Sequence, residues 1–576
     1  MVRRYNFSLG EILNLFAFLY NSCLNSPMPK KTISNKIKQW FVLGQKFWIL
    51  LILSAILFLF NSYNTPIIDG DSFYYISHAK KILYSGDWLN LSSLMSKPPL
   101  GLWIWALTYK LLGVSLFSTL FWHAAFSFLL IWITYRLAEE IFNSKAALFS
   151  ALILLSTFQM FYMARTPMLD MSFAVILAGF YLYFYLFLKT KKESNLYLAA
   201  LMLGLAFINK GLLAFVLPGI SIVPFMFFTK DQLFFKKKKD YQKDAIKILL
   251  SVFIVFLAIA PWVIPQVIVH RQKFIAYFWE ENITRFFHPI DGPTTKPQRD
   301  IYMYFIYLAI GFLPWSGYLL SAFMKPWKEK WQNKRRDFIY LLTWIVFPFI
   351  LFSISGHWKV PRYIFPIFPA LAIFLGKYWQ DLLVKQGKYL KKSILWGIII
   401  SFLFSVPILL FAVAAHFMIF PEQTEVLKLF IFTFLGILFI AVFSGNILVI
   451  LKKYKEAFYT FFIISFLAYF VFLAMSPNVF SKLLPEKNFC HKVMVQVPAN
   501  VPIAVWDMPV RSVDFYLKRP VNHFSDFNNL RQYVKNKTFV YIVFKDEKES
   551  NKILPYLGKR YNIQVREQNL LLVRVK

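Results

Sequence analysis

Two carboxylates stand close together in the run Ile68-Asp69-Gly70-Asp71, directly after the first long apolar stretch of the chain. A carboxylate in this place can accept a proton from an attacking hydroxyl or amine, or it can bind a divalent metal ion. The same side chains could instead only cap the helix that the following residues predict, up to about residue 84. Spacing alone supports the catalytic and the capping interpretation equally.

A further acid, Asp170, stands in the run Arg165-Thr166-Pro167-Met168-Leu169-Asp170, at the start of a later apolar stretch. Taken alone, it fits a helix N-cap with a favourable dipole interaction better than it fits a catalytic role. Ionisable groups at or near membrane depth are costly to keep. Asp170 therefore stays a functional candidate.

Cations also occur between apolar stretches, and they are Lys97, Arg285, Lys359 and Arg362. Such side chains can bind phosphate, Arg through a planar fork of donors. The alternative is that they reach from an apolar surface to the membrane interface, next to a belt of aromatic residues. Acids, cations and aromatic residues together indicate chemistry on a phosphate-bearing lipid.

The elements that must position these residues are membrane helices. Hydrophobic residues make up 58% of the 576 residues and charged residues 16%, against about 45–50% and about 25% in soluble proteins. This composition excludes a soluble enzyme, a disordered chain and a fibrous protein. The net charge of +35 fits cationic loops that orient helices and face lipid headgroups, and we expect no nucleic-acid partner.

About thirteen stretches are apolar enough for membrane spans. They are 47–63, 115–135, 146–163, 171–188, 196–208, 212–228, 248–269, 301–323, 338–355, 360–376, 393–416, 427–451 and 458–476. Lysine-rich loops alternate with less basic ones, so the positive-inside rule places the lysine-rich side in the cytoplasm. All the acids and cations above then fall on the outer face, and the C-terminal tail lies there too.

The expected fold is an all-α polytopic membrane protein with a small C-terminal α/β domain outside the membrane. We expect an N-terminal segment 1–46, a membrane domain 47–480 with outer loops at about 64–100 and 270–300, and an outer domain 485–576. In the tail, β-branched and aromatic residues predict strands at 501–506, 538–544 and 570–575. Ser525 is expected to cap a helix that ends near Asn536.

At these residues the chain resembles the GT-C superfamily of lipid-linked-sugar glycosyltransferases, in particular the bacterial lipid A aminoarabinose transferases and the related protein O-mannosyltransferases. Seven motifs match in order over residues 47–380. They are Asp71 and Tyr75 with Gly86-Asp87-Trp88 and Lys97-Pro98; Leu169-Asp170; Lys210-Gly211; Pro261-Trp262; the aromatic run 279–286; Leu313-Pro314-Trp315; and Lys359-Val360-Pro361-Arg362-Tyr363-Ile364-Phe365-Pro366.

The resemblance implies a role for each matching residue. Asp71 would activate the acceptor, directly or through a divalent metal, and Asp170 would be a second active-site acid. Lys97 and Arg285 would bind the donor phosphate, with Lys359 or Tyr363 helping, because fixed cations stabilise a phosphate leaving group. The further substrate-binding candidates are Tyr75, Asp69, Glu281 and Arg362.

Two positions depart from the aminoarabinose transferase pattern: Ser96 replaces a metal-binding Glu, and Tyr74 replaces an Arg. They leave the metal and the sugar open. No Walker A motif or glycine-rich dinucleotide fingerprint is present, so we expect no nucleotide cofactor.

The expected function is inverting transfer of a sugar from a polyprenyl-phosphate carrier, at the periplasmic face of the bacterial inner membrane. A lipid A-like glycolipid is the favoured acceptor, with another glycan or a protein as alternatives. A protein O-glycosyltransferase of the same fold, or a lipid transporter or flippase without enzyme activity, are the rival functions. A transporter predicts ionisable residues deep within spans and helices broken at the midplane. A structural membrane protein would not explain the recurring acids and cations.

Overall fold

The structure is a computed structural model. It describes residues 34–64, 67, 70–89, 98–230, 234, 241–284, 300–328, 334–355, 359–384, 388–414, 425–483, 485–498, 501–507, 512–517, 519, 521–557, 560–568 and 570–575. Three of the predicted site residues, Asp69, Lys97 and Arg285, lie outside these ranges.

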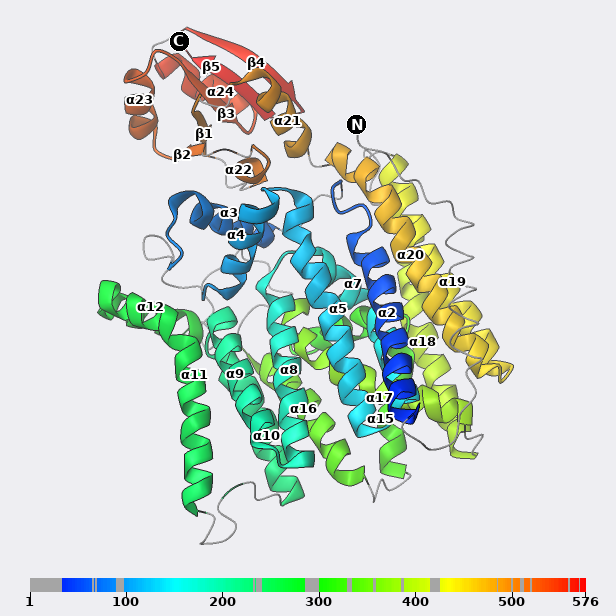
Figure 1. The fold of residues 1–576 in the computed structure, drawn as a ribbon. Helices are drawn as coiled ribbons and strands as arrows, with labels where there is room; N and C mark the ends of the chain where they lie inside the picture. The colour runs from blue at the N-terminus through cyan, green and yellow to red at the C-terminus, as the bar shows by residue number, and fades with distance from the viewer. Residues whose placement is uncertain are drawn as a thin grey trace.

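Most of the described chain folds into a bundle of apolar helices (Figure 1). Helices satisfy their own backbone hydrogen bonds, which hydrocarbon cannot do for them. The bundle elements are α2 (Ser34–Leu59), α5 (Leu116–Ile141), α6 (Ser144–Leu155), α7 (Phe158–Arg165), α8 (Leu169–Thr190), α9 (Glu193–Lys210), α10 (Leu213–Thr229), α11 (Tyr241–His270), α14 (Met303–Gly311), η4 (Ser316–Tyr318), α15 (Leu319–Lys328), α16 (Arg335–Ile354), η6 (Pro361–Ile367), α17 (Phe368–Val384), α18 (Lys388–Ala414), α19 (Glu425–Ile450) and α20 (Tyr454–Leu483).

Each of the thirteen predicted stretches overlaps one or more of these helices, and the chain is a multi-span membrane protein. By length and composition, seven helices within the described residues can cross a membrane, or up to nine if the bent pairs α6–α7 and α14–α15 each count as one span. The described apolar parts of α2, α10 and α18 are shorter, and α9 carries a charge at each end. For these four helices the span assignment remains a prediction.

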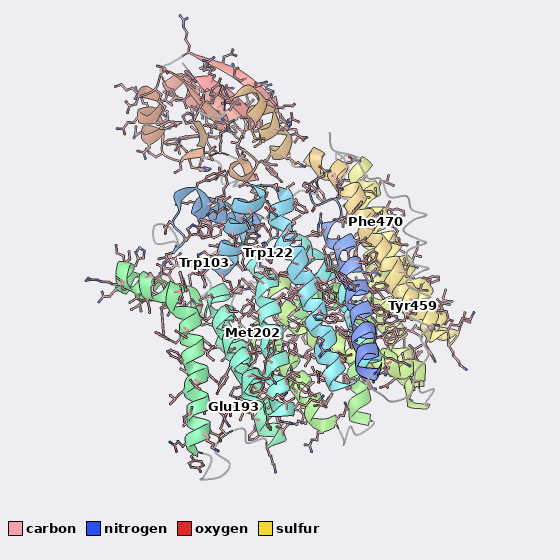
Figure 2. All side chains as sticks on the ribbon, in the orientation of Figure 1. Trp103, Trp122, Glu193, Met202, Tyr459 and Phe470 are labelled. Atoms are coloured by element: carbon pink, nitrogen blue, oxygen red, sulfur yellow. The ribbon has the colours of Figure 1, made fainter. Side chains whose placement is uncertain are left out.

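Close helix packing builds the core of the bundle. At Gly376 in α17, a methyl group would meet the backbone N of Ser150 in α6 at 2.5 Å, so only glycine lets these two helices approach. Side chains fill the space between the helices (Figure 2). Trp103 and Trp122 lie toward the end of the bundle next to the C-terminal domain, whereas Glu193 lies toward the opposite end.

A layer of short helices lies across the end of the bundle that faces the C-terminal domain (Figure 1). It consists of α3 (Gly70–Ser85), α4 (Leu100–Leu112), α12 (Gln272–Trp279) and the π-helical turn η2 (Glu280–Thr284). The helix α3 lies in the first predicted outer loop, α12 and η2 lie in the second, and α4 begins where the first loop was expected to end. Of the predicted site residues, α3 brings Asp71 and Tyr75 to this end of the molecule, and η2 brings Glu281.

The C-terminal domain is built on one five-stranded sheet with the order β2-β1-β3-β5-β4. The pairs β1–β2 and β1–β3 are parallel, and the pairs β3–β5 and β4–β5 are antiparallel. The elements are α21 (Glu486–Gln496), β1 (Ile503–Trp506), α22 (Ser512–Tyr516), β2 (Val521–Phe524), α23 (Phe527–Lys535), β3 (Val540–Phe544), α24 (Glu547–Ile553), η8 (Leu554–Leu557), β4 (Tyr561–Glu567) and β5 (Leu570–Val575).

The sequence predicted the three inner strands but missed β2 and β4. Both missed strands lie at the edges of the sheet and expose several side chains, so they lack the apolar pattern of β1, β3 and β5. The predicted helix is α23, but its cap was assigned one residue too early. The carboxylate of Asp526, and not Ser525, accepts the hydrogen bond from the backbone N–H of Asn529.

Candidate active site

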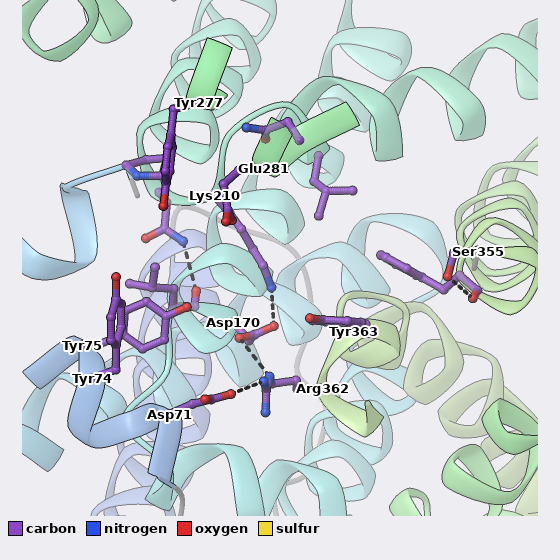
Figure 3. Close-up of a pocket in the computed structure, with 16 residues that line it drawn as sticks. Asp71, Tyr74, Tyr75, Asp170, Lys210, Tyr277, Glu281, Ser355, Arg362 and Tyr363 are labelled. Atoms are coloured by element: carbon purple, nitrogen blue, oxygen red, sulfur yellow. Dashed lines mark hydrogen bonds and ion pairs between the residues drawn. The ribbon is translucent and has the colours of Figure 1, made fainter. Parts of the chain in front are cut away.

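A cavity of about 400 Å³ opens where the short-helix layer meets the bundle (Figure 3). Its walls come from α3, α8, α9, α10, α12, η2, the end of α16 and η6. Both predicted catalytic acids, Asp71 and Asp170, line it. Of the other predicted residues, Tyr75, Glu281, Arg362 and Tyr363 line it as well.

Asp170 lies in the first turn of α8, and its side chain is 7% exposed. The N-cap of α8 is Met168, so Asp170 is not the capping residue that the alternative interpretation required. Its Oδ1 atom accepts a hydrogen bond from Lys210 Nζ, and its Oδ2 atom lies 3.9 Å from Arg362 Nε. Two cations thus compensate a buried negative charge that would otherwise be costly.

Two buried side chains hold the backbone just before Asp170. His123 Nε2 lies 3.0 Å from the backbone N of Met168, and the amide of Asn209 donates to the carbonyl of Leu169 at 3.0 Å. Ser172 in turn donates to Asn209 at 2.9 Å. The start of α8 is therefore fixed to both α5 and α9, which sets the position of the carboxylate.

Asp71 lies in the first turn of α3 and is far more accessible than Asp170. Its side chain is 65% exposed, and its Oδ2 atom accepts a hydrogen bond from Arg362 Nη2 at 2.8 Å. Arg362, only 16% exposed, therefore lies between the two carboxylates (Figure 3). An accessible carboxylate next to a cavity can accept a proton from a substrate that enters it.

Sequence reasoning did not place Lys210 among the site residues, although the Lys210-Gly211 motif was visible. Its ammonium lies over the ring of Tyr363, 5.2 Å from the centroid, and bonds to Asp170. A lysine at the very end of an apolar stretch was the available signal. Asn209, Tyr277, Asn282 and Ser355 also line the cavity and were missed. Uncharged side chains give little signal in sequence.

Gly211 lets η2 approach the end of α9. Its φ is +74°, and a methyl group there would lie 2.5 Å from Asn282 Oδ1. That same oxygen accepts a hydrogen bond from the backbone N–H of Leu212 at 3.2 Å. This contact holds η2 in place. It leaves Glu281 of η2 and Tyr277 of the adjoining α12 at the edge of the cavity.

Lys359 is not brought to the cavity wall. It is 1% exposed, and its ammonium donates to the backbone carbonyls of Phe352 and Ser355 at the C-terminal end of α16. Burial lowers the pKa of Lys359 below its ordinary value. In this position it caps α16 and holds the chain that leads into η6, where Arg362 and Tyr363 lie.

Tyr75 lies one helical turn after Asp71 on α3 and presents its hydroxyl to the same cavity. Burial, followed by the negative charge of Asp170, raises the pKa of Tyr75 far above its ordinary value. The phenol therefore stays protonated at physiological pH. It can donate a hydrogen bond, but it cannot act as a base.

The described carboxylates of Asp71 and Asp170 in the cavity are paired with arginine and lysine side chains and are not arranged as metal ligands. Among the described residues, no group of three or more His, Cys, Asp or Glu side chains is placed to hold a metal. The two carboxylates that could begin such a site are bonded to Arg362 and Lys210 instead. No chemical step is therefore assigned to a metal.

Comparisons with known proteins agree with this architecture. The family model described as dolichyl-phosphate-mannose-protein mannosyltransferase matches residues 96–264, which contain Asp170 and Lys210. A protein of Aquifex aeolicus without an assigned function is 34% identical over 365 residues, which cover 62% of this chain and 68% of that protein.

A curated relative is also similar to this chain in sequence, and a solved structure is similar to it in fold. Undecaprenyl phosphate-alpha-4-amino-4-deoxy-L-arabinose arabinosyl transferase from Photorhabdus laumondii is 29% identical over 54% of this chain, which spans about half (55%) of that relative's length. The crystal structure of ArnT from Cupriavidus metallidurans bound to undecaprenyl phosphate superposes with a TM-score of 0.75, over 93% of this chain and 98% of that one, at 17% identity. At this identity the likeness shows the fold alone.

The helical membrane bundle with a small α/β domain at one end is the fold that this chain shares with ArnT. The sequence motifs predicted a likeness to lipid-linked-sugar glycosyltransferases, and the mannosyltransferase family model matches the chain over residues 96–264. The chain is similar in sequence to the aminoarabinose transferases over about half of its length.

Proposed function

We propose that this protein transfers a sugar from a polyprenyl-phosphate carrier to an envelope acceptor, and that the acceptor is a lipid A-like glycolipid. The site faces the periplasm, on the outer side of the bacterial inner membrane. The observation that carries the proposal is the arrangement around Arg362: an exposed carboxylate, Asp71, and a buried one, Asp170, lie on either side of one guanidinium in a cavity at the end of the bundle.

Asp71 is the proposed base. The acceptor hydroxyl attacks the anomeric carbon and gives its proton to Asp71, while the bond from that carbon to the phosphate oxygen breaks. The polyprenyl phosphate leaves with the electron pair, so attack from the opposite side inverts the anomeric configuration. Arg362 and Lys210 are the described cations that can stabilise the charge developing on the phosphate.

Arg362 has a further role in this scheme. In the structure its guanidinium is bonded to Asp71, and a donor phosphate would compete for the same planar set of donors. Binding of the donor would then release the Asp71 carboxylate for the acceptor proton. This order prevents Asp71 from acting before the donor is in place.

Lys97 and Arg285 remain proposed phosphate ligands. Their support comes from chain neighbours: Pro98 directly follows Lys97 and lines the cavity, and Asn282 lines it three residues before Arg285. Asp69 remains a proposed substrate contact on the same grounds, two residues before Asp71. Lys359 keeps an indirect role, because its ammonium is bonded to carbonyl oxygens.

The test is mass spectrometry of lipid A and of the total lipid extract. We compare cells with the gene, cells without it, and cells that carry Asp71→Ala or, as a control, Glu280→Gln, an exposed acid next to the cavity residue Glu281. The proposal expects a pentose- or hexose-sized mass on lipid A that is lost in the deletion and in Asp71→Ala but kept in Glu280→Gln.

Protein O-glycosylation is the second candidate, favoured by the mannosyltransferase family match over residues 96–264. The same experiment separates the two. Unchanged lipid A together with an accumulated polyprenyl-phosphate sugar in the deletion strain would move the acceptor to a protein or another glycan. Unchanged lipid A without any accumulated carrier sugar would contradict both candidates.

A further inference from the structure

The helix that carries Asp71 also carries the contact surface for the C-terminal domain. Asp71, Tyr74 and Tyr75 lie on the face of α3 that lines the cavity. Phe73, Ile76 and Lys80, spaced three and four residues apart, lie on the opposite face, and all three are buried. The main partners of α3 are α4 on one side and α22 of the C-terminal domain on the other.

An apolar contact joins the two parts. Phe515 of α22 is 2% exposed and belongs to one hydrophobic cluster with Phe73 and Ile76 of α3 and with Leu169, the residue before Asp170. The ring of Phe73 lies 6.1 Å from that of Phe515 and 5.9 Å from that of Tyr516. The C-terminal domain thus packs into the cluster that contains Phe73, two residues after Asp71, and Leu169, the residue before Asp170.

A polar contact fixes the orientation of this packing. Lys80 is 5% exposed, and its ammonium donates to two backbone carbonyls of the C-terminal domain, those of Asp514 and of Arg519, the latter at 3.2 Å. These carbonyls, more than 400 residues away in sequence, replace the water that the ammonium loses on burial, and they are in place only when the two parts are packed together. The contact therefore couples α3 to the domain in one arrangement.

We propose that the C-terminal domain positions α3, the helix that carries Asp71, and that Lys80 is the positioning residue through which the domain holds this helix. Lys80 acts through α3 and does not touch the substrate. This inference rests on the proposed function for its effect on catalysis, but not for its effect on the order of α3. Loss of the contact lets α3 move relative to Arg362, and small displacements of a catalytic base lower turnover strongly.

The experiment uses the full chain in lipid nanodiscs. The variants are Lys80→Met and Phe515→Ala. Lys81→Met is the matched control, because Lys81 is the next residue of the same helix and is exposed. Lys80→Arg tests rescue, since it keeps the charge and the donors. Amide hydrogen exchange over residues 70–85 reports the order of α3, and binding of undecaprenyl phosphate reports the phosphate site.

For Lys80→Met and Phe515→Ala we expect amide exchange in α3 to become faster, and kcat to fall, by about tenfold or more. The affinity for undecaprenyl phosphate should change by less than about twofold. Lys81→Met should match the wild type, and Lys80→Arg should recover most of kcat. Unchanged exchange in α3 would overturn the inference. A raised acceptor KM at unchanged kcat would also overturn it, because the domain would then recognise the acceptor instead. If even the wild type transfers no sugar, the proposed function fails, while exchange still decides whether the domain holds α3.

Discussion

Arg362 and Asp71 are 291 residues apart in the chain, yet the guanidinium of Arg362 donates to the Asp71 carboxylate at 2.8 Å. Arg362 comes from η6 at the bundle end, whereas Asp71 comes from the short-helix layer. The bond joins the two layers across the cavity. It also pairs the proposed base with a cation that a phosphate can capture.

The first prediction concerns the proposed base. Asp71→Asn should lower kcat for sugar transfer by about 10²-fold or more, because the amide cannot accept the acceptor proton. Folding should be unaffected, since the Asp71 side chain is mostly exposed. Steady-state kinetics in nanodiscs measure the effect, with Glu280→Gln as the control. Full activity of Asp71→Asn would remove Asp71 from the chemistry.

The second prediction separates charge compensation from catalysis at Asp170. Lys210→Met should destabilise the protein by about 3 kcal/mol, because it removes the closer of the two cations that compensate the buried Asp170 carboxylate. The double variant Lys210→Met with Asp170→Asn should regain part of this stability but no activity. Thermal unfolding in detergent and transfer assays measure the two effects. If the double variant is no more stable than Lys210→Met, Lys210 does not stabilise the protein by compensating the charge of Asp170.

The third prediction concerns the approach of η2 to α9. Gly211→Ala should destabilise the protein by about 1–2 kcal/mol and weaken donor binding, because it combines an unfavourable φ with a clash against Asn282. Gly219→Ala is the control, since no atom lies within 4 Å of the added methyl group in α10. Equal unfolding temperatures for the two variants would contradict the proposed role of this contact.

The fourth prediction is a pH dependence of the C-terminal domain contact. Burial lowers the pKa of Lys80 from 10.5 in solvent to about 8, and the negative charge of Asp514 partly opposes this shift. The docked state thus binds the proton more weakly than the free state. Below pH 8 docking carries the full cost of burying the ammonium, and this cost falls as the pH rises from 8 to 10.5.

Protection of α3 against hydrogen exchange, corrected for the intrinsic rate at each pH, should therefore rise over that interval. Lys80→Met should abolish the rise. Burial raises the pKa of the Cys490 thiol and of the Tyr516 phenol, so both groups stay neutral over this interval. We therefore assign the pH dependence to the Lys80 ammonium. A rise of equal size in Lys80→Met would assign the titration to another group.

The sequence by itself predicted a bundle of membrane helices followed by a small C-terminal α/β domain, and the structure shows both. Apolar stretches must form helices in hydrocarbon, and this rule needs no tertiary information. The sequence also singled out Asp71 and Asp170 as candidates, because acids at the start of apolar stretches are rare and costly, and both line the cavity. The edge strands β2 and β4 were not predicted from the sequence, because exposed strands lack an apolar pattern.

Only the tertiary structure decided how these residues are paired. It bonded Lys210 to Asp170, set Arg362 between the two acids, and turned Lys359 onto the end of α16. It also joined Lys80 to the C-terminal domain. Local patterns fix which face of a helix is apolar. The partner of a charged side chain depends instead on the packing of helices that are distant in sequence.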